Sequence, residues 1–500
     1  MDPAFRDPSP FLLLPRLEKV PVESRSLTRL RDLLGSEVFD RSYTDLKNMA
    51  AQLGSRKVLH VNSTAKGGGV AEILAFLVPY FADIGVHVTW LVLKGDDEFF
   101  KITKRIHNGL HGFPGDGGNL SLAEAHHYEK VCKFNAFQIG PLLKPNDIVI
   151  CHDPQTAGLI PILKRYHAVC IWRCHIGSEQ LSNHCVTRSW KFLRPYVLQA
   201  DHCCFTRADY VPPFFDKKKV SVLLPSISAF SPKNQPMDPE VALCIIQHLG
   251  VVGFRHQSPT CDCLEFRRLD GSRGLIRRFA DIMHAGPLPF LTDPMILQVS
   301  RWDRLKDMVG VMSAFVDFVL PEHPQAFLLL VGPNVHGVSD DPEEGLAYDE
   351  CLSRWRALPH MARSRVQIVC LPVRDVQENA AMVNALQTHA TVITQKSLQE
   401  GFGLTVTEAL WKKKPVVASA VGGIKDQIES GKQGLLIRNP HDLEQFGRSI
   451  NQILSDESLG TSLAAQGHEK VQQCFLALRH VRDYMDLFLR VGQQDGEVDQ

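Results

Sequence analysis

Short apolar runs alternate with longer helical patterns along most of this chain of 500 residues. The runs are rich in branched residues and bounded by turn formers, a pattern that is typical of buried strands. The predicted strands lie at 57–62, 87–93, 147–151, 168–173, 202–206 and 220–224, and again at 295–300, 326–332, 366–371, 390–394, 415–419 and 434–437. Helical periodicity fills most of the intervals, for example at 70–84, 308–320 and 404–413. Since helices that join parallel strands cover both faces of their sheet, the pattern predicts an α/β protein with two Rossmann-like domains facing a cleft.

The two predicted domains are separated by a stretch dense in proline and glycine, at 229–293, where no long regular element is expected. We therefore expect an N-terminal domain at 1–228 and a C-terminal domain at 294–474. Near the C-terminus, apolar residues at helical spacing over 463–489 predict a packing helix.

Composition gives no reason to expect nucleic acid or a membrane as a partner. The 55 basic and 55 acidic side chains cancel, and no apolar stretch reaches the length of a membrane span. The 13 cysteines are scattered without the spacing of a metal site, and we interpret them as reduced thiols of a cytoplasmic protein. A homodimer is expected only because dimers are common among soluble proteins.

The most informative motif is Glu400-Gly-Phe-Gly-Leu-Thr-Val-Thr-Glu408, which lies between a predicted strand and a predicted helix. Ligands of open α/β sheets bind in such loops, and the first N–H groups of the helix attract phosphate. Carboxylates accept hydrogen bonds from vicinal hydroxyls. We therefore assign a sugar to Glu400, a ribose to Glu408 and a phosphate to the backbone of 402–405, a set that suits a nucleotide-sugar.

Two further groups follow predicted strands in positions where a ligand is expected. Gly67, Gly68 and Gly69 let a backbone approach a ligand without obstruction by a Cβ atom, although a tight turn would look the same. Arg301 and Lys306 follow the strand that ends at Ser300, and both cations suit phosphate oxygens.

Histidines also follow two predicted strands of the first half. His152 and Asp153 come after 147–151, and His175 comes after 168–173. A single histidine is more often structural than catalytic, so these positions alone do not establish a site.

Together with Val61-Asn-Ser-Thr-Ala-Lys-Gly-Gly-Gly-Val-Ala-Glu72, His152-Asp-Pro-Gln155 and Trp172-Arg-Cys-His175, the motif at 400–408 resembles the retaining glycosyltransferases of family 4. More narrowly, these segments resemble the trehalose synthases that join a nucleotide-glucose to free glucose. The resemblance covers roughly residues 55–490. It implies the two-domain GT-B fold, with an acceptor domain first, a donor domain second and a helix at about 475–491 that crosses back onto the first domain.

The resemblance also implies a role for each candidate residue. The donor is expected to contact Gly67, Gly68, Arg301, Lys306, Glu400, Gly401, Phe402, Gly403, Leu404, Thr405 and Glu408. The acceptor is expected at His152 and Asp153, and the catalytic set is His175, Arg301, Lys306 and Glu400. Glu400 and Glu408 stand too far apart to flank one bond as the paired carboxylates of retaining glycosidases do, so both are expected to anchor hydroxyl groups.

No Asp-x-Asp motif occurs in the chain, so we expect transfer without a metal or other cofactor, with Arg301 and Lys306 neutralising the leaving diphosphate. Three alternatives stay open. The protein could be a trehalose phosphorylase, a family 4 enzyme with another acceptor, or a nucleotide-sugar-binding regulator that has lost catalysis. The nucleotide base and the role of 253–290, an insertion relative to short family members, are not specified by the sequence.

Overall fold

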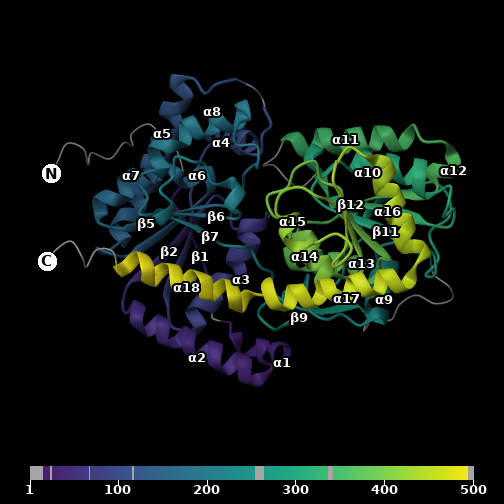
Figure 1. Cartoon of the computed structure of the whole chain (residues 1–500), viewed down its shortest axis with the longest axis horizontal. Coiled ribbons are helices and arrows are strands. Elements are labelled where there is room, and N and C mark those ends of the chain that lie inside the picture. The colour runs from purple at the N-terminus through teal and green to yellow at the C-terminus, as the bar shows by residue number, and fades with distance from the viewer. Residues whose placement is uncertain are drawn as a thin grey trace. The chain divides into compact units, whose positions relative to one another are not determined.

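The computed structural model describes residues 15–22, 25–66, 68–114, 118–253, 264–335 and 342–493. The chain divides into two compact units (Figure 1). Unit 1 is Met1–Ser226 with Ala477–Gln500, and unit 2 is Ile227–Leu476. Each contains one seven-stranded sheet, and the predicted α/β fold is confirmed.

The sheet of unit 1 has the order β1-β3-β2-β4-β5-β6-β7. All neighbouring strands are parallel except β1 and β3. The strands are β1 (Glu18–Val20), β2 (Lys57–Asn62), β3 (His87–Val92), β4 (Ile148–His152), β5 (Val169–Cys174), β6 (His202–Phe205) and β7 (Val220–Val222). Since the chain runs outward in both directions from β2 and β4, the winding reverses between these two strands.

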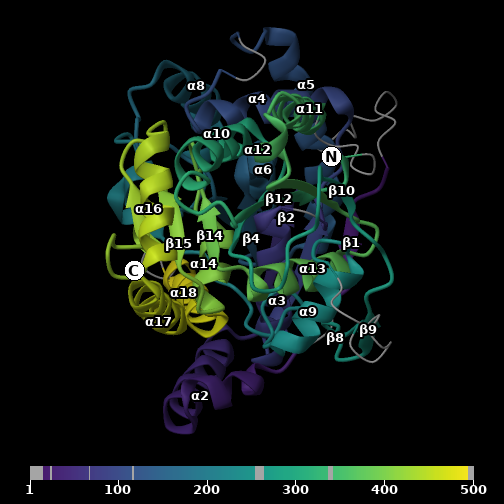
Figure 2. The same ribbon diagram turned by 90° about the vertical axis from the view of Figure 1, so that its right-hand side faces the viewer.

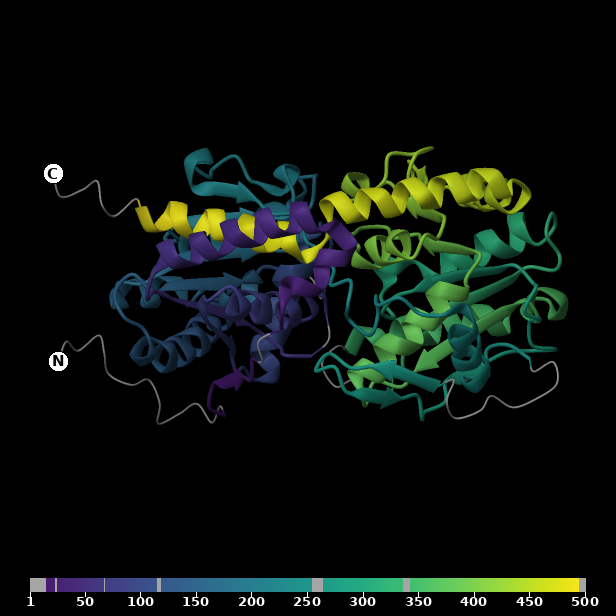
Figure 3. The same cartoon turned by 90° about the horizontal axis from the view of Figure 1, so that it is seen from below.

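Helices cover both faces of this sheet. One face packs with α4 (Asp97–Leu110), α5 (Leu122–Ile139) and α8 (His184–Val197) in a large apolar cluster. On the other face, α3 (Gly69–Asp83) and α18 (Ala477–Gln493) bring aromatic rings onto β2. Figure 3 shows α18 lying beside α2 (Ser36–Leu53). The chain therefore returns to unit 1 at its C-terminus.

The sheet of unit 2 has the order β10-β13-β12-β11-β14-β15-β16 and is parallel except at β10. The strands are β10 (Asp281–Met283), β11 (Met295–Val299), β12 (Phe327–Pro333), β13 (Val366–Leu371), β14 (Val392–Gln395), β15 (Val416–Ser419) and β16 (Leu435–Ile437). Apart from the edge strand β10, this is the doubly wound order of dinucleotide-binding sheets, with its reversal between β11 and β14.

Two layers of helices enclose the sheet of unit 2 (Figure 2). The apolar cluster of one face includes α10 (Met308–Ala314), α11 (Pro342–Arg356) and α16 (Leu443–Ser455). The remaining helices include α9 (Pro239–His248), α13 (Val376–His389), α14 (Leu404–Trp411) and α17 (Glu457–Cys474). Among the helices that the structure describes, none has both the length and the apolarity needed to cross a membrane.

Two expectations about chain organisation differ from the structure. The described residues of 229–293 do not form a separate linker, because they belong to unit 2, where β10 pairs with β13. The described part of 253–290 includes a short hairpin of β8 (Glu265–Arg267) and β9 (Arg273–Leu275). The single helix expected over 463–489 is two helices, α17 and α18, separated at Phe475 and Leu476. Both residues are buried, so their hydrophobicity continued the helical pattern across the break.

Candidate active site

The loops that follow β11 and β14 meet at the winding reversal of unit 2, the position where open α/β sheets bind their ligands. Arg301 and Lys306 follow β11, and Glu400 follows β14. The structure brings Lys306 and Glu400 into contact, with Lys306 Nζ donating to Glu400 Oε2 at 2.5 Å. The side chain of Lys306 is 17% exposed and that of Glu400 is 12% exposed, so solvent reaches only a small part of the pair.

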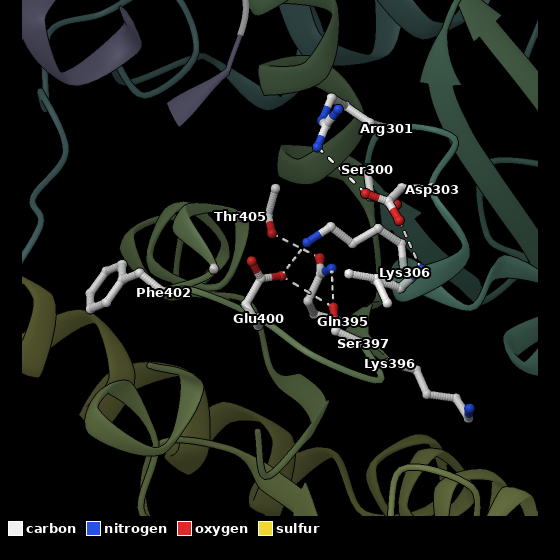
Figure 4. A network of polar contacts seen from close by, with 12 residues as sticks. Ser300, Arg301, Asp303, Lys306, Gln395, Lys396, Ser397, Glu400, Phe402 and Thr405 are labelled. Carbon is white, nitrogen blue, oxygen red and sulfur yellow. Dashed lines mark hydrogen bonds and ion pairs between the residues drawn. The ribbon is translucent and has the colours of Figure 1, made fainter. Parts of the chain in front are cut away.

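Neighbouring polar groups fix the Glu400 carboxylate (Figure 4). The buried Ser397 donates its hydroxyl to Glu400 Oε2 at 3.2 Å and accepts from Gln395 Nε2 at 3.0 Å. Thr405 in turn donates to Gln395 Oε1 at 2.8 Å. The network therefore connects the first turn of α14 to the carboxylate and the ammonium.

Arg301 lies in the same loop and forms ion pairs with two carboxylates. Its guanidinium is 45% exposed, and its ion pairs to Asp303 and Glu344 measure 3.5 Å and 3.6 Å. These distances exceed those of strong charge-assisted hydrogen bonds. An anionic ligand would compete with these two carboxylates for the guanidinium.

The segment 401–405 forms the turn before α14. Gly403 has φ +84°, a left-handed conformation that suits glycine, and no side chain caps the helix after it. The first N–H groups of α14 therefore lack a side-chain partner at the cap position. Phe402 is buried and its ring contacts Phe475, which makes the aromatic side chain part of the core. Gln427 Nε2 donates to the carbonyl oxygen of Phe402 at 2.5 Å, which anchors the turn.

Glu408 has a different environment from Glu400. It is 2% exposed, and its Oε1 lies 3.4 Å from Lys233 Nζ. Lys412 lies nearby, and burial lowers the pKa of its ammonium to about 7, while Glu408 opposes that shift. A ribose at Glu408 would have to compete with Lys233, and the ribose role stays a prediction.

In unit 1, the loops after β2, β4 and β5 carry the other predicted residues. Gly67 lies outside the described residues. Gly68 has φ +79° and precedes α3, with no atom within 4 Å of the position that a Cβ would take. His152 is the last residue of β4, and His175 directly follows β5.

A third histidine, His60 of β2, joins these two in a chain of stacked rings. His60 Nδ1 lies 3.0 Å from His152 Nε2, and His152 Nδ1 lies 2.9 Å from His175 Nε2. His152 is 2% exposed and uses both ring nitrogens, so it would reach an acceptor through His175. Burial lowers the pKa of all three rings, that of His60 to about 3, and the imidazoles are neutral near pH 7. His60 was not predicted as part of a site, and its only signal in the sequence is a polar residue among the apolar residues at the centre of β2.

Asp153 orients His175 from the adjacent strand end. Its Oδ1 accepts the backbone N–H of His175 at 2.7 Å, and its own backbone has φ +61°. Burial raises the pKa of its carboxyl to about 7, opposed by the His175 N–H group and by Arg173. Arg173, which belongs to the motif Trp172-Arg-Cys-His175, is fully buried and donates to the carbonyl oxygen of Leu223 at 2.7 Å.

Among the described residues, no group of three or more His, Cys, Asp or Glu side chains is arranged to hold a metal ion. Unit 2 by itself offers two cations, a fixed carboxylate and a helix start, and unit 1 by itself offers neutral imidazoles. These groups can bind anionic oxygens and hydroxyls, as a sugar attached to a phosphate presents them.

Two family models match this chain. Residues 60–212 match the family described as "Trehalose synthase, N-terminal domain", and residues 281–470 match "Glycosyl transferases group 1". The trehalose synthase of Thermococcus litoralis is 33% identical over 467 residues, which cover 93% of this chain and 97% of that protein. That of Rubrobacter xylanophilus is 32% identical over 481 residues, or 95% of this chain and 99% of the relative.

Two further comparisons are more distant. The trehalose phosphorylase of Pleurotus sajor-caju is 27% identical over 82% of this chain but only 55% of its own length. The solved α,α-trehalose-phosphate synthase (UDP-forming) of Burkholderia vietnamiensis superposes with a TM-score of 0.63 at 15% identity, covering 87% of this chain and 98% of that one. This structural likeness shows a shared fold.

The two doubly wound units and the group 1 match define a glycosyltransferase with the GT-B fold. Because relatives above 30% identity match nearly the whole chain, this protein belongs to the trehalose synthase family. It is therefore an enzyme, a hexosyltransferase.

Proposed function

We propose that this enzyme transfers a glucosyl group from a nucleoside-diphosphate-glucose to glucose, with retention of configuration, and so forms α,α-trehalose. The observation that carries the proposal is the contact between Lys306 and Glu400 at the winding reversal of unit 2, with Arg301 in the same loop. A cation beside a fixed carboxylate suits a ligand that carries a diphosphate next to a sugar. The names of the full-length relatives support trehalose as the product.

Each side chain has a defined task in this proposal. Arg301 and Lys306 neutralise the diphosphate as it leaves, and Glu400 anchors hydroxyls of the transferred glucose. The backbone of Gly68 and of 401–405 approaches the donor, and Glu408 serves the ribose. In unit 1, His175 contacts the transferred sugar, while His152 and Asp153 belong to the acceptor side.

The proposed reaction breaks the bond between glucose C1 and the diphosphate oxygen and forms a bond from C1 to the acceptor oxygen. The acceptor attacks on the face from which the diphosphate departs, which retains the configuration. The acceptor hydroxyl gives its proton to a diphosphate oxygen, so the products are trehalose and the protonated nucleotide. In this scheme, the protein contributes positioning and charge stabilisation, without a metal or other cofactor.

Trehalose phosphorolysis is the second candidate, because trehalose phosphorylases match 82% of the chain at 27% identity. Arg301 and Lys306 would then bind inorganic phosphate. The lower identity and the partial coverage of those relatives favour the synthase reaction. Cytoplasmic location and a homodimeric state remain predictions from composition and base rate.

The purified protein should be incubated with glucose and each nucleoside-diphosphate-glucose in the presence of a chelator, and non-reducing disaccharide should be measured. Trehalose that forms despite the chelator would support the donor, the acceptor and metal independence together. Slow nucleotide release without disaccharide would refute glucose as acceptor. Glucose 1-phosphate formed from trehalose and phosphate, with no reaction of the nucleotide donors, would establish the phosphorylase instead.

A further inference from the structure

The geometry of His60, His152 and His175, here called the histidine chain, limits the direction in which their hydrogen bonds can run. The central ring, His152, faces another imidazole at each nitrogen, at 3.0 Å and 2.9 Å. A neutral imidazole carries one N–H and one lone pair. His152 must therefore donate to one neighbour and accept from the other, which leaves only two arrangements of the three protons.

The two arrangements differ at the buried end of the chain. If His152 donates to His60, then His60 must carry its own proton on Nε2. If His60 donates to His152, then Nε2 of His60 keeps a lone pair. His60 Nε2 is buried and has no hydrogen-bond partner among the described residues. Buried N–H groups without a partner are rarer than unpaired acceptors, so the second arrangement is favoured.

The surroundings of His60 agree with a neutral ring that lacks a partner at Nε2. Its ring stacks on Phe81 of α3 with centroids 5.9 Å apart and meets the edge of Tyr484 of α18 at the same distance. On α18, His480 bonds through Nδ1 to Ser226 Oγ at 2.9 Å. Next to His152 and His175, the charged or titratable groups are Arg173 and Asp153. Burial and the positive charge of Arg173 both lower the pKa of these two imidazoles, which keeps them neutral.

We propose that His60 and His152 are positioning residues that fix the tautomer of His175, so that His175 accepts at Nε2 and presents an N–H donor at Nδ1. His175 is partly exposed, whereas the two rings behind it are buried. The functional part of this inference rests on the proposed function. There, His175 is a hydrogen-bond donor to an oxygen of the transferred sugar and does not act as a base. The acceptor proton must then go to the diphosphate.

The first test is the tautomer in the wild-type protein. Histidine labelled with ¹⁵N, assigned with a His175→Asn variant, reports by NMR which ring nitrogen is protonated. We expect the proton of His175 on Nδ1, in the protein without substrates. A proton on Nε2 of His175 would overturn the inference, whatever the enzyme assay shows.

A matched pair of variants tests whether His60 sets this state. His60→Met places an acceptor without a donor against His152 Nε2, and a thioether can accept, as Met308 Sδ does from Gln298 Nε2 at 3.4 Å in unit 2. His60→Phe is similarly apolar but offers no such acceptor. We expect the His175 proton to move to Nε2 in His60→Met and to stay on Nδ1 in His60→Phe.

The activity of the two variants separates positioning from general stability. His60→Met is expected to lower kcat at least tenfold more than His60→Phe does, with a smaller change in KM. His202→Phe, which removes a buried histidine of β6 that bonds to Ser221 outside the histidine chain, controls for packing. An unmoved His175 proton in His60→Met would overturn the role of His60. If the wild type makes no trehalose but the tautomers follow the expectation, the proposed function fails and the histidine chain stands.

Discussion

Among single residues, the contact between Lys306 and Glu400 carries most of the proposed chemistry. Lys306→Met is expected to lower kcat/KM for transfer by about 10²-fold or more, because a cation that stabilises a leaving diphosphate is lost. Steady-state kinetics with a nucleoside-diphosphate-glucose measure this effect. The matched control is Arg304→Gln, since Arg304 lies two residues away in an exposed ion pair with Glu350. Comparable losses in the two variants would show that Lys306 acts only through the charge of the loop.

The raised pKa of Asp153 is expected to make the fold less stable as the pH rises. The pKa of its carboxyl is about 7 in the fold against an ordinary value of 3.8, so the folded state favours the protonated form. The stabilisation of the fold by protonated Asp153 is therefore fully present below pH 3.8 and is lost as the pH rises through 7. Asp153→Asn keeps an acceptor for the His175 N–H group and tolerates φ +61°.

Relative to the wild type, Asp153→Asn is expected to gain roughly 1–4 kcal/mol of stability at pH 8 and almost nothing at pH 4. Urea unfolding at several pH values measures the difference between the two proteins. The buried histidines affect the pH dependence of stability in the opposite direction. Both proteins contain them, so their effect cancels when the two stabilities are subtracted. A constant difference across this pH range would contradict the raised pKa of Asp153.

Among the helices and strands, the parallel strands were predictable because most of them are buried and read as apolar runs between turn formers. The twelve predicted strands match β2 to β7 and β11 to β16 within about two residues at each end. β1 was not predicted, because its three residues are partly exposed and are held by pairing with β3. His60 was missed for a related reason: the sequence does not show that histidines on three strands share one face.

The turn before α14 determines where Glu400 lies. A Cβ atom at Gly403 would sit 3.2 Å from Glu400 Cγ and 3.2 Å from Ile424 Cγ1, at φ +84°. Gly403→Ala is expected to cost about 1–2 kcal/mol through backbone strain and to lower kcat/KM more than tenfold by displacing Glu400. Unfolding and kinetics are measured on the same preparations.

Gly431→Ala is the control for this turn. It has φ +88° and no atom within 4 Å of the added Cβ, so it introduces strain without a contact. We expect a similar loss of stability and nearly unchanged activity. Equal losses of activity in the two variants would contradict a role for the turn in placing Glu400.

In the molecule as a whole, each unit has its own large apolar cluster, which supports the candidate residues of that unit. Unit 1 includes residues from both ends of the chain, because α18 packs on α3 and β2 through Tyr484 and Phe488. The histidine chain therefore depends on α18, which begins at Ala477, far along the sequence from His175. Unit 2 is formed from one continuous segment and holds the candidate donor groups.

Replacing Phe488 tests whether the two units have independent cores. It is fully buried, with its ring centroid 5.7 Å from those of Phe81 and Tyr484. Phe488→Ala is expected to destabilise unit 1 by about 3–5 kcal/mol, since it leaves a cavity in a packed core. Phe446→Ala removes an equally buried ring from unit 2 and is the matched control.

Hydrogen exchange read peptide by peptide distinguishes the two variants, whereas a single unfolding midpoint would not, because a chain with two cores need not unfold in one step. Phe488→Ala should accelerate exchange in β2, β4 and α3 more than in β11 and β14, and Phe446→Ala should do the reverse. If Phe488→Ala accelerates exchange equally in both units, the cores are not independent. Loss of α18 would then destabilise the candidate residues of unit 2 as much as the histidine chain of unit 1.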